Sequence, residues 1–433
     1  MLLNRTKAGM GVVVAWARGL VRRASVLACA AAVGAAMLMP AAQAHAQFDM
    51  MGMMEGGLVN KRSVNAYSKL LGFDKDQTET AMTLMEGSRA ANTAAMKEFQ
   101  NKMQDLQNKA QSSGDWQSVQ KEMGEIGTQM QEKMTDLEKQ FFDDLKAICT
   151  DEQATKWERV ERLRRREQGM RFGFVSGAGV DLVALADRQK LDDKGEVKEL
   201  LSDYELSIDK PLMQLKRMQE EQAKRQKEMM EKMMKDPMSG MEEAKKMLGE
   251  VAEIGKDMRG INRDFARKIA AVLPEDARTK FEDEIARKSF PRVYKEAYAS
   301  KLLAAATELP DLTADQKETL GQIRKSYADD ARPLNEKWAK AIEAQEDKHN
   351  GTFGVVMDVA MSQAMGGTDD TTKEVNEAKA ARKDLDEKIE KRVTDLLSAA
   401  QKTKMPEKVV EPENPWSDMM PEGLGAGETD DEK

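Results

Sequence analysis

An internal repeat constrains the fold of this chain more than any other feature. Three octamers that end in Thr-Lys and an apolar residue lie 124 residues apart, at Thr150–Trp157, Pro274–Phe281 and Ser398–Met405. A second marker recurs at intervals of 118 and 121 residues, at Phe73–Gln77, Leu191–Gly195 and Leu312–Gln316. Markers held at a nearly fixed period predict tandem copies of one structural unit.

The residues between the markers favour long helices. Charged residues make up 33% of the chain and aromatic residues only 5%, a balance that disfavours sheets. Apolar residues recur at helical spacing, as at Phe141, Leu145 and Ile148. Turn-forming segments lie midway in each unit, at Ser112–Asp115, Asp236–Gly240 and Gly366–Asp369. We therefore expect an all-α fold of three tandem, coiled-coil-like helical hairpins, at residues 63–168, 180–290 and 295–405.

The two ends of the chain differ from the repeats. Residues 1–46 hold five basic residues and no acidic one, and a 16-residue apolar run (24–39) is followed by Ala-x-Ala sites. This pattern is typical of a cleaved signal peptide, because a membrane span usually needs about 20 apolar residues; an uncleaved anchor is the alternative. We expect a flexible Met/Gly-rich segment at 47–62 and a disordered acidic tail at 406–433. The protein is thus predicted to be periplasmic or secreted from a bacterial cell, with no membrane span after signal cleavage.

Composition also disfavours several function classes. Without residues 1–46, 63 basic residues stand against 76 acidic ones, a net charge of −13 that disfavours nucleic acid. His349 is the one histidine within the repeats, and Cys149 is their one cysteine. The sequence lacks the residues that a catalytic triad, a histidine-rich zinc site or a phosphate-binding glycine loop would need. We therefore predict no enzyme activity, no cofactor and no catalytic residue. His349 is expected to be solvated, and Cys149 to be a buried apolar residue, because it aligns with Leu273 and Leu397.

The marker motifs themselves are predicted to start helices. A Thr, Ser or Asp side chain can accept a hydrogen bond from the free N–H groups of a helix start, and a Gln three residues later can bond back to the N–H of the cap residue. This spacing occurs at Thr150/Gln153, Thr313/Gln316, Ser398/Gln401 and Asp74/Gln77. The second unit departs from the pattern, with Gly195 and Ala277 at the glutamine positions and Pro274 at a cap. Each cap should stabilise its helix by about 1 kcal/mol.

Leu312–Gln316 reads Leu-Thr-x-x-Gln, and Cys149–Gln153 comes close to it. On these motifs the chain resembles the periplasmic LTxxQ-motif family of Spy/CpxP-like helical envelope proteins, in three degenerate tandem copies. The resemblance implies an ATP-independent, chaperone-like or stress-associated protein whose partners are unfolded or envelope proteins. Three units in one chain depart from the family's usual single unit and its dimeric cradle. A structural or scaffolding coiled-coil protein of the envelope therefore remains the alternative.

Methionine provides a further candidate site. Outside residues 1–46 the chain has 28 of its 32 methionines. Six of them crowd the middle of the second unit: Met229, Met230, Met233, Met234, Met238 and Met241. Three interpretations stay open, namely plain helix packing, an adaptable surface for client proteins, and a Cu(I) site of soft thioether ligands.

Two more segments are candidate contacts with a partner. The cluster Arg162–Arg166 either grips an acidic partner or forms an ordinary solvated helix face. The stretch Thr352–Met365 is unusually apolar for a hairpin tip. We predict that it mediates self-association or partner binding through Val355, Val356, Val359 and Met361.

Overall fold

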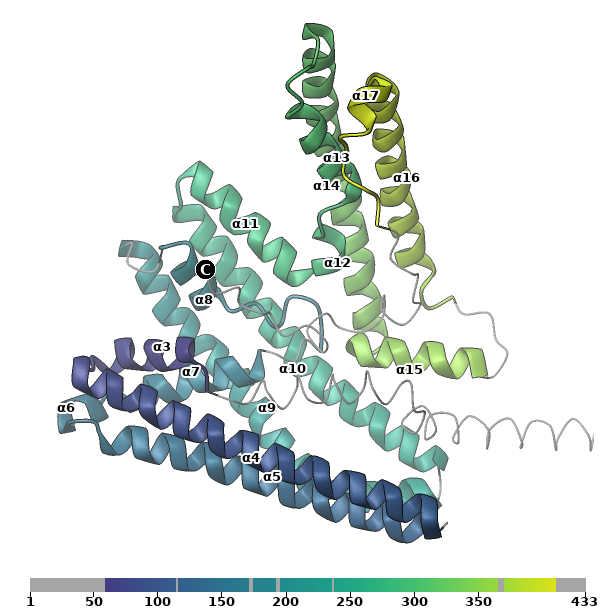
Figure 1. Cartoon of the computed structure of the whole chain (residues 1–433). Helices are drawn as coiled ribbons and strands as arrows, with labels where there is room; N and C mark the ends of the chain where they lie inside the picture. Colours follow the sequence, from purple (N-terminus) through teal and green to yellow (C-terminus); the bar gives the residue numbers. More distant parts are fainter. Residues whose placement is uncertain are drawn as a thin grey trace, which may run out of the picture. The chain divides into compact units, whose positions relative to one another are not determined.

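The computed structural model describes residues 59–113, 116–170, 174–191, 195–235, 237–364 and 370–409. All regular secondary structure in these ranges is helical, which confirms the prediction of an all-α fold (Figure 1). In the same ranges no helix combines the length and the apolar character that crossing a bilayer requires. The predicted signal peptide, the Met/Gly-rich segment up to residue 58 and the tail from residue 410 lie outside the described residues.

The chain divides into two compact units, within Met50–Gln168 and within Gly169–Lys433. The helices of the first unit are α3 (Lys61–Leu71), α4 (Lys75–Ser113), α5 (Trp116–Ala147), α6 (Asp151–Ala154) and α7 (Trp157–Gly169). The long helices α4 and α5 lie side by side and form pair 1 (Figure 1). We call the end of a pair where its first helix begins and its second helix ends the base. The main core of this unit lies at the base of pair 1, where Tyr67, Phe142 and Leu145 are buried.

The second unit holds two more long helix pairs. Its helices are α8 (Leu182–Arg188), α9 (Gly195–Lys235), α10 (Pro237–Val272), α11 (Glu275–Ser289), α12 (Pro291–Tyr294), α13 (Tyr298–Thr307), α14 (Ala314–Lys348), α15 (Gly351–Ala364), α16 (Lys373–Leu396) and α17 (Ala399–Lys402). Helices α9 and α10 pack together as pair 2, and α14 and α16 as pair 3. Each pair is preceded by a shorter helix, α8 or α13, and each has its own buried apolar cluster.

Helix α15 interrupts pair 3 where the sequence predicts a hairpin tip. It contacts α10 and α14, so its apolar residues pack within the chain. Val355 and Val359 are buried, and Val356 and Met361 are partly exposed. The expectation that Val355 and Val359 are available to a partner is therefore wrong for this conformation, because an intrachain helix contact already covers them.

Candidate functional site: two glutamine clasps

The predicted helix caps are present at the base of pairs 1 and 3. Thr150, Thr313 and Ser398 each cap a helix with the side-chain oxygen, and the glutamine three residues on bonds back to the cap N–H. At the start of α4 the same exchange joins Asp74 and Gln77, with distances of 2.8 and 3.1 Å. All four capping boxes are thus confirmed.

The glutamines of pair 1 also bind each other across the base. The Gln77 Nε2 donates to Gln153 Oε1 at 2.8 Å, and the Gln153 Nε2 donates back to Gln77 Oε1 at 2.9 Å. The second N–H of each amide reaches a backbone carbonyl of the opposite segment. Gln77 donates to Ile148 O at 2.8 Å, and Gln153 donates to Gly72 O at 3.1 Å. We call this reciprocal amide pair a glutamine clasp.

The clasp uses the full hydrogen-bonding capacity of both amides. A glutamine side chain offers two N–H donors and a carbonyl oxygen with two lone pairs. In the Gln77–Gln153 clasp both N–H groups donate, and each Oε1 accepts from the partner amide and from the N–H of its own cap residue. A fully satisfied polar network fixes geometry without the cost of unpaired buried groups. The clasp therefore joins the start of α4 to the end of α5 in one register.

Pair 3 has the same arrangement. The Gln316 Nε2 donates to Gln401 Oε1 at 3.1 Å and to Leu396 O at 2.9 Å. The Gln401 Nε2 donates to Gln316 Oε1 at 3.3 Å and to Asp311 O at 3.1 Å. Gln401 is only 3% exposed and Gln316 is partly exposed, so one of the two glutamines of this clasp is shielded from solvent. The same bonding pattern occurs in both clasps, which indicates that the glutamines of the two motifs in a unit serve to make this contact.

Pair 2 closes its base differently. The glutamine positions hold Gly195 and Ala277, and the cap of α11 is Pro274, which makes no side-chain cap bond. Ala277 instead packs against an apolar cluster that includes buried Leu191, Leu273 and Phe281. An apolar contact thus occupies the end of pair 2 where pairs 1 and 3 carry polar clasps.

The contact between the two glutamines is the part of the site that sequence reasoning missed. The capping boxes explain one bond of each glutamine and leave the remaining bonds of its amide unassigned. The signal that could have revealed the contact is the joint loss in the second unit, where both glutamines are replaced together by Gly195 and Ala277. Residues lost together are expected when they bind each other.

Hydrogen bonds from tyrosine hydroxyls reinforce the first unit and pair 3. The Tyr67 hydroxyl of α3 donates to Glu167 at 2.5 Å, and burial together with the Glu167 charge raises the pKa of Tyr67 far above its usual range. In pair 3 the Tyr327 hydroxyl donates to Asp386 at 2.6 Å and accepts from Arg382 at 2.9 Å. Burial, and the bond to Asp386, raise the pKa of Tyr327 as well. Both phenols therefore remain protonated donors, which suits structural bonds.

The arginine cluster of α7 is not a solvated helix face. Side-chain exposure is 18% for Arg162 and Arg164 and 13% for Arg165, and Arg166 is 2% exposed. Arg164 pairs with Glu138 of α5 at 3.0 Å, and its guanidinium lies 4.2 Å from the centroid of the Phe142 ring. The solvated interpretation is wrong because α7 packs back on α5, where Arg164 takes part in the contact, and the other arginines of the cluster are largely buried as well.

His349 is not solvated either. Its side chain is 12% exposed, and its Nδ1 lies 2.7 Å from Asp358 of α15. The sequence suggested a loop, and His349 does follow the last residue of α14, but α15 begins at once and covers it.

Cys149 is partly buried beside the base of pair 1. Its Sγ lies 3.5 Å from the Leu145 carbonyl oxygen, and it packs against the apolar core there. Burial raises the pKa of the thiol, although Lys146 opposes the shift. A raised pKa keeps the less reactive thiol form, which agrees with an apolar packing role.

The methionine cluster lies on α9 and α10, but its side chains are outside the described residues. The Cu(I) interpretation of Met229–Met241 therefore stays a prediction. Among the described residues, no group of three or more His, Cys, Asp or Glu side chains is arranged to hold a metal ion.

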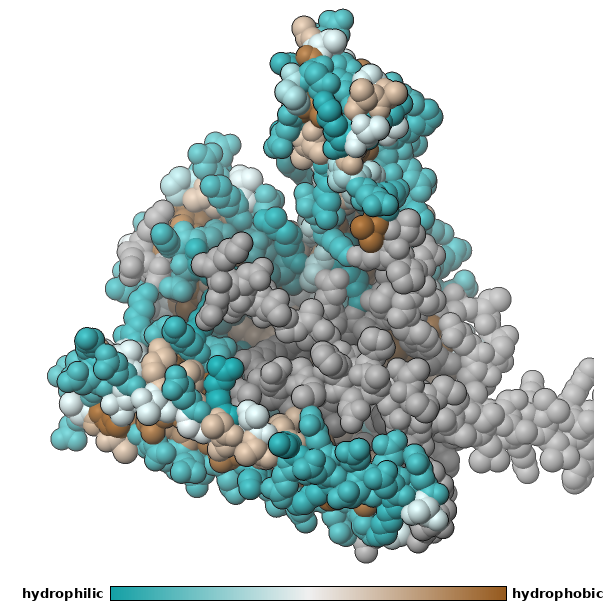
Figure 2. Space-filling view, viewed as in Figure 1, coloured by the Kyte–Doolittle hydropathy of each residue, from teal (hydrophilic) through white to brown (hydrophobic). Residues whose placement is uncertain are grey.

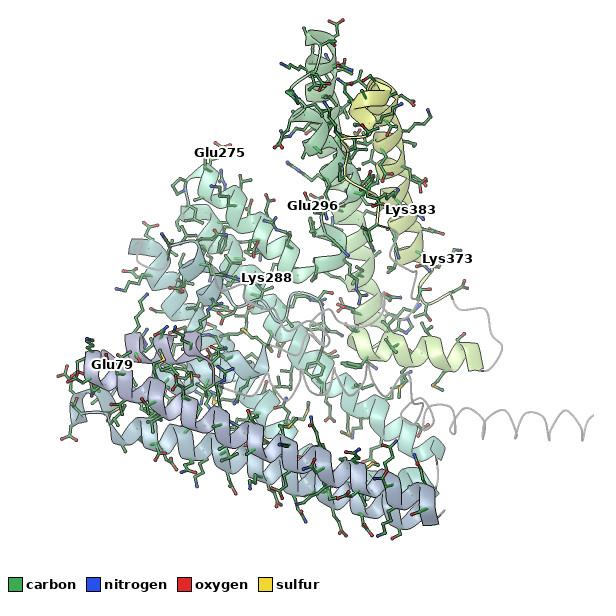
Figure 3. The ribbon with its side chains drawn as sticks, viewed as in Figure 1. Glu79, Glu275, Lys288, Glu296, Lys373 and Lys383 are labelled. Carbon is green, nitrogen blue, oxygen red and sulfur yellow. The ribbon has the colours of Figure 1, made fainter. Side chains whose placement is uncertain are left out.

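The described surface is dominated by charged and polar side chains. One face is mostly hydrophilic, with apolar residues in small patches (Figure 2). Charged residues such as Glu79, Glu275 and Lys383 project outward from their helices (Figure 3). The large apolar side chains exposed among the described residues are Met123, Leu206, Met213, Val272 and Val409. An open groove of about 370 Å³ between α5 and α7 mixes Phe142 and Trp157 with lysines and acids.

In comparisons with known proteins, the chain matched no family model, no curated protein and no solved structure.

Proposed function

We propose that the protein is an exported, non-enzymatic component of the bacterial envelope that binds other proteins in a chaperone-like or stress-associated manner. In this proposal the chain begins with a cleaved signal peptide. The three helix pairs are tandem copies of one LTxxQ-type hairpin, and the acidic tail is a flexible extension.

The glutamine clasp is the observation that carries the proposal. Each residue type of the motif has a structural task in pair 3. Leu312 packs against the apolar cluster, Thr313 caps α14, and Gln316 forms the clasp with Gln401. A motif used in this way where the first helix of a hairpin begins and again just after its second helix ends supports the resemblance to the LTxxQ-motif family, although the clasp itself is structural.

The proposal is tested by aggregation suppression. The purified chain without residues 1–46 is mixed at equal concentration with a chemically denatured client that has been diluted into buffer, and light scattering is followed without ATP. We expect slower aggregation than with a matched concentration of an inert helical protein. Equal aggregation in both mixtures would contradict chaperone-like binding.

The second candidate is a scaffold that spaces or braces envelope components. It is favoured by the burial of the apolar residues at the base of each pair and, within the part of the chain that the structure describes, by the small number of large apolar side chains that are exposed. A holding chaperone needs accessible apolar surface, whereas a scaffold buries its own. A scaffold is expected to bind defined folded partners and to leave client aggregation unchanged, so the same scattering assay separates the two.

A further inference from the structure

The groove between α5 and α7 combines aromatic rings with lysines, and all of its lining residues belong to the first unit. Two rings line it, those of Phe142 and Trp157, with centroids 6.5 Å apart and planes tilted by 78°. Phe142 is 4% exposed, and the guanidinium of Arg164 lies over its ring. Trp157 is partly exposed. The Trp157 ring is therefore the aromatic surface that a ligand in the groove can reach.

The side chain of Trp157 is held in place by two neighbours. Its indole N–H donates to Glu161, one turn further along α7, at 3.1 Å. The Nζ of Lys146 lies 5.6 Å from the centroid of the ring. Because the indole N–H is already bonded, a ligand gains most by apolar contact with the ring. A ring that is ordered in advance also loses little freedom when a ligand packs on it.

Two cations beside the rings have no anionic partner. Lys139 and Lys146 of α5 are exposed, and neither lies within ion-pair distance of a carboxylate in the part of the chain that the structure describes. Arg164, in contrast, pairs with Glu138 at 3.0 Å and lies 3.7 Å from Glu161. The two lysines are therefore the cations of the groove that remain available to an anionic ligand.

The spacing of the lysines favours a peptide as the ligand. Lys139 and Lys146 are seven residues apart. Their Cα atoms are thus separated by about 10 Å along the helix axis, which corresponds to roughly three residues of an extended chain. A small molecule with one carboxylate reaches one lysine, whereas an extended peptide with two acidic residues reaches both. Asp143, which lines the groove between them, repels a dense polyanion but can accept a hydrogen bond from a peptide N–H.

This combination of residues occurs in the first unit alone among the three repeats. At the last position of the octamers, Phe281 of pair 2 is fully buried, whereas its counterpart Trp157 is partly exposed. The other groove residues also change when the units are aligned on the 124-residue spacing. The counterparts of Lys139, Phe142 and Lys146 are Arg263, Ala266 and Ala270 in the second unit, and Glu387, Glu390 and Thr394 in the third.

We propose that the groove is a docking site for an extended acidic segment of another protein, in which an aromatic residue lies between two acidic ones. The aromatic ring packs on Trp157, and the two acidic side chains pair with Lys139 and Lys146. Exposed ion pairs contribute little free energy, so the ring supplies most of the affinity and the lysines set the direction of the segment. The inference rests on the proposed function, because it names the kind of segment that a bound protein would present.

The test is a peptide titration followed by fluorescence anisotropy. The full chain without residues 1–46 is added to a fluorescein-labelled peptide of sequence Gly-Glu-Ser-Trp-Glu-Ser-Gly. We expect saturable binding that weakens as the salt concentration rises. A peptide with alanine in place of tryptophan should bind about tenfold more weakly, because aromatic anchors carry much of the binding free energy at such sites. The absence of saturable binding, or equal affinity for the two peptides, overturns the proposal.

Charge reversal in the protein locates the binding site. Lys139→Glu/Lys146→Glu should weaken binding about tenfold, because like charges then face each other. Lys97→Glu/Lys133→Glu is the matched control, since it makes the same change of charge at exposed positions of pair 1 outside the groove, and it should keep the affinity. Equal losses for the two variants contradict the proposal. If the groove variant does not fold, a peptide with glutamine in place of glutamate decides, and unchanged affinity of the unsubstituted chain for it refutes the pairing.

Two further outcomes identify the occupant and separate this inference from the proposed function. Residues 413–418 of the chain hold an acidic sequence with one tryptophan. Peptide binding that appears only after deletion of residues 410–433 would assign the groove to the chain's own tail and overturn a foreign partner. Aggregation suppression without peptide binding contradicts the groove alone, whereas peptide binding without aggregation suppression contradicts chaperone-like activity alone.

Discussion

Pairs 2 and 3 lie in the same compact unit, yet their bases close by different physical means. The base of pair 3 is held by directional hydrogen bonds between Gln316 and Gln401. The base of pair 2 is held by apolar packing around Phe281. Apolar contact is non-directional and scales with buried area, whereas a polar network stabilises only when every group is satisfied. The comparison shows that the base of a helix pair can be closed either by a large buried apolar area or by a few hydrogen bonds of correct geometry.

Removing the apolar closure should have the largest effect. Phe281 is fully buried. Phe281→Ala should lower the free energy of unfolding by about 3–5 kcal/mol, because it removes apolar contact and leaves a cavity. Chemical denaturation followed by circular dichroism measures the loss. Phe281→Leu, which keeps most of the volume, is the control and should cost clearly less. Equal losses for the two variants would argue that packing at this site is unimportant.

Breaking the polar closure should lower the free energy of unfolding by somewhat less. Gln401→Ala leaves the Gln316 amide without its partner in a half-buried site. The expected loss is about 1–3 kcal/mol, the cost of an unsatisfied buried polar group. Gln322→Ala, an exposed glutamine on α14, is the matched control and should change stability little.

The double variant Gln316→Ala/Gln401→Ala sharpens this test. If the two amides act on each other, the combined loss should be smaller than the sum of the single losses by at least about 0.5 kcal/mol. Strict additivity would show that the clasp is only two independent caps.

The smallest expected effect on stability concerns the helix caps at the bases of pairs 2 and 3. Thr313→Ala removes the side-chain acceptor of the α14 cap and should cost about 1 kcal/mol. Pro274 makes no side-chain cap bond at the start of α11. Pro274→Ala should therefore change stability by less than Thr313→Ala, as read from thermal unfolding. The reverse order would mean that the capping boxes do not distinguish pair 3 from pair 2.

Much of the local structure could be predicted from sequence because it depends on near neighbours. The caps at Thr150, Thr313 and Ser398 follow from a residue type and a spacing of three positions. Contacts between distant segments could not be predicted in this way. Gln316 and Gln401 are 85 residues apart, and which amide faces which depends on how α14 and α16 align.

The errors have the same physical origin. The arginines of α7 and His349 resemble solvated residues in a local sequence window, because charge and a nearby turn favour exposure. Their burial results from contacts with α5 and α15, and neither helix position can be read from neighbouring residues. Helix α15 was likewise predicted as a hairpin tip, since its apolar residues do not reveal that α10 and α14 cover them.

The clasps also bear on how the chain folds. The Gln316–Gln401 contact closes a loop of 85 residues, and closing a long loop costs chain entropy before the contact returns any free energy. Contacts of this kind tend to form late, after local helices and nearby turns have paired. We therefore expect clasp variants to speed unfolding while leaving the folding rate nearly unchanged, as in residues that are unstructured in the transition state. The clasp would then mainly slow unfolding, and so set the lifetime of a hairpin after it has folded.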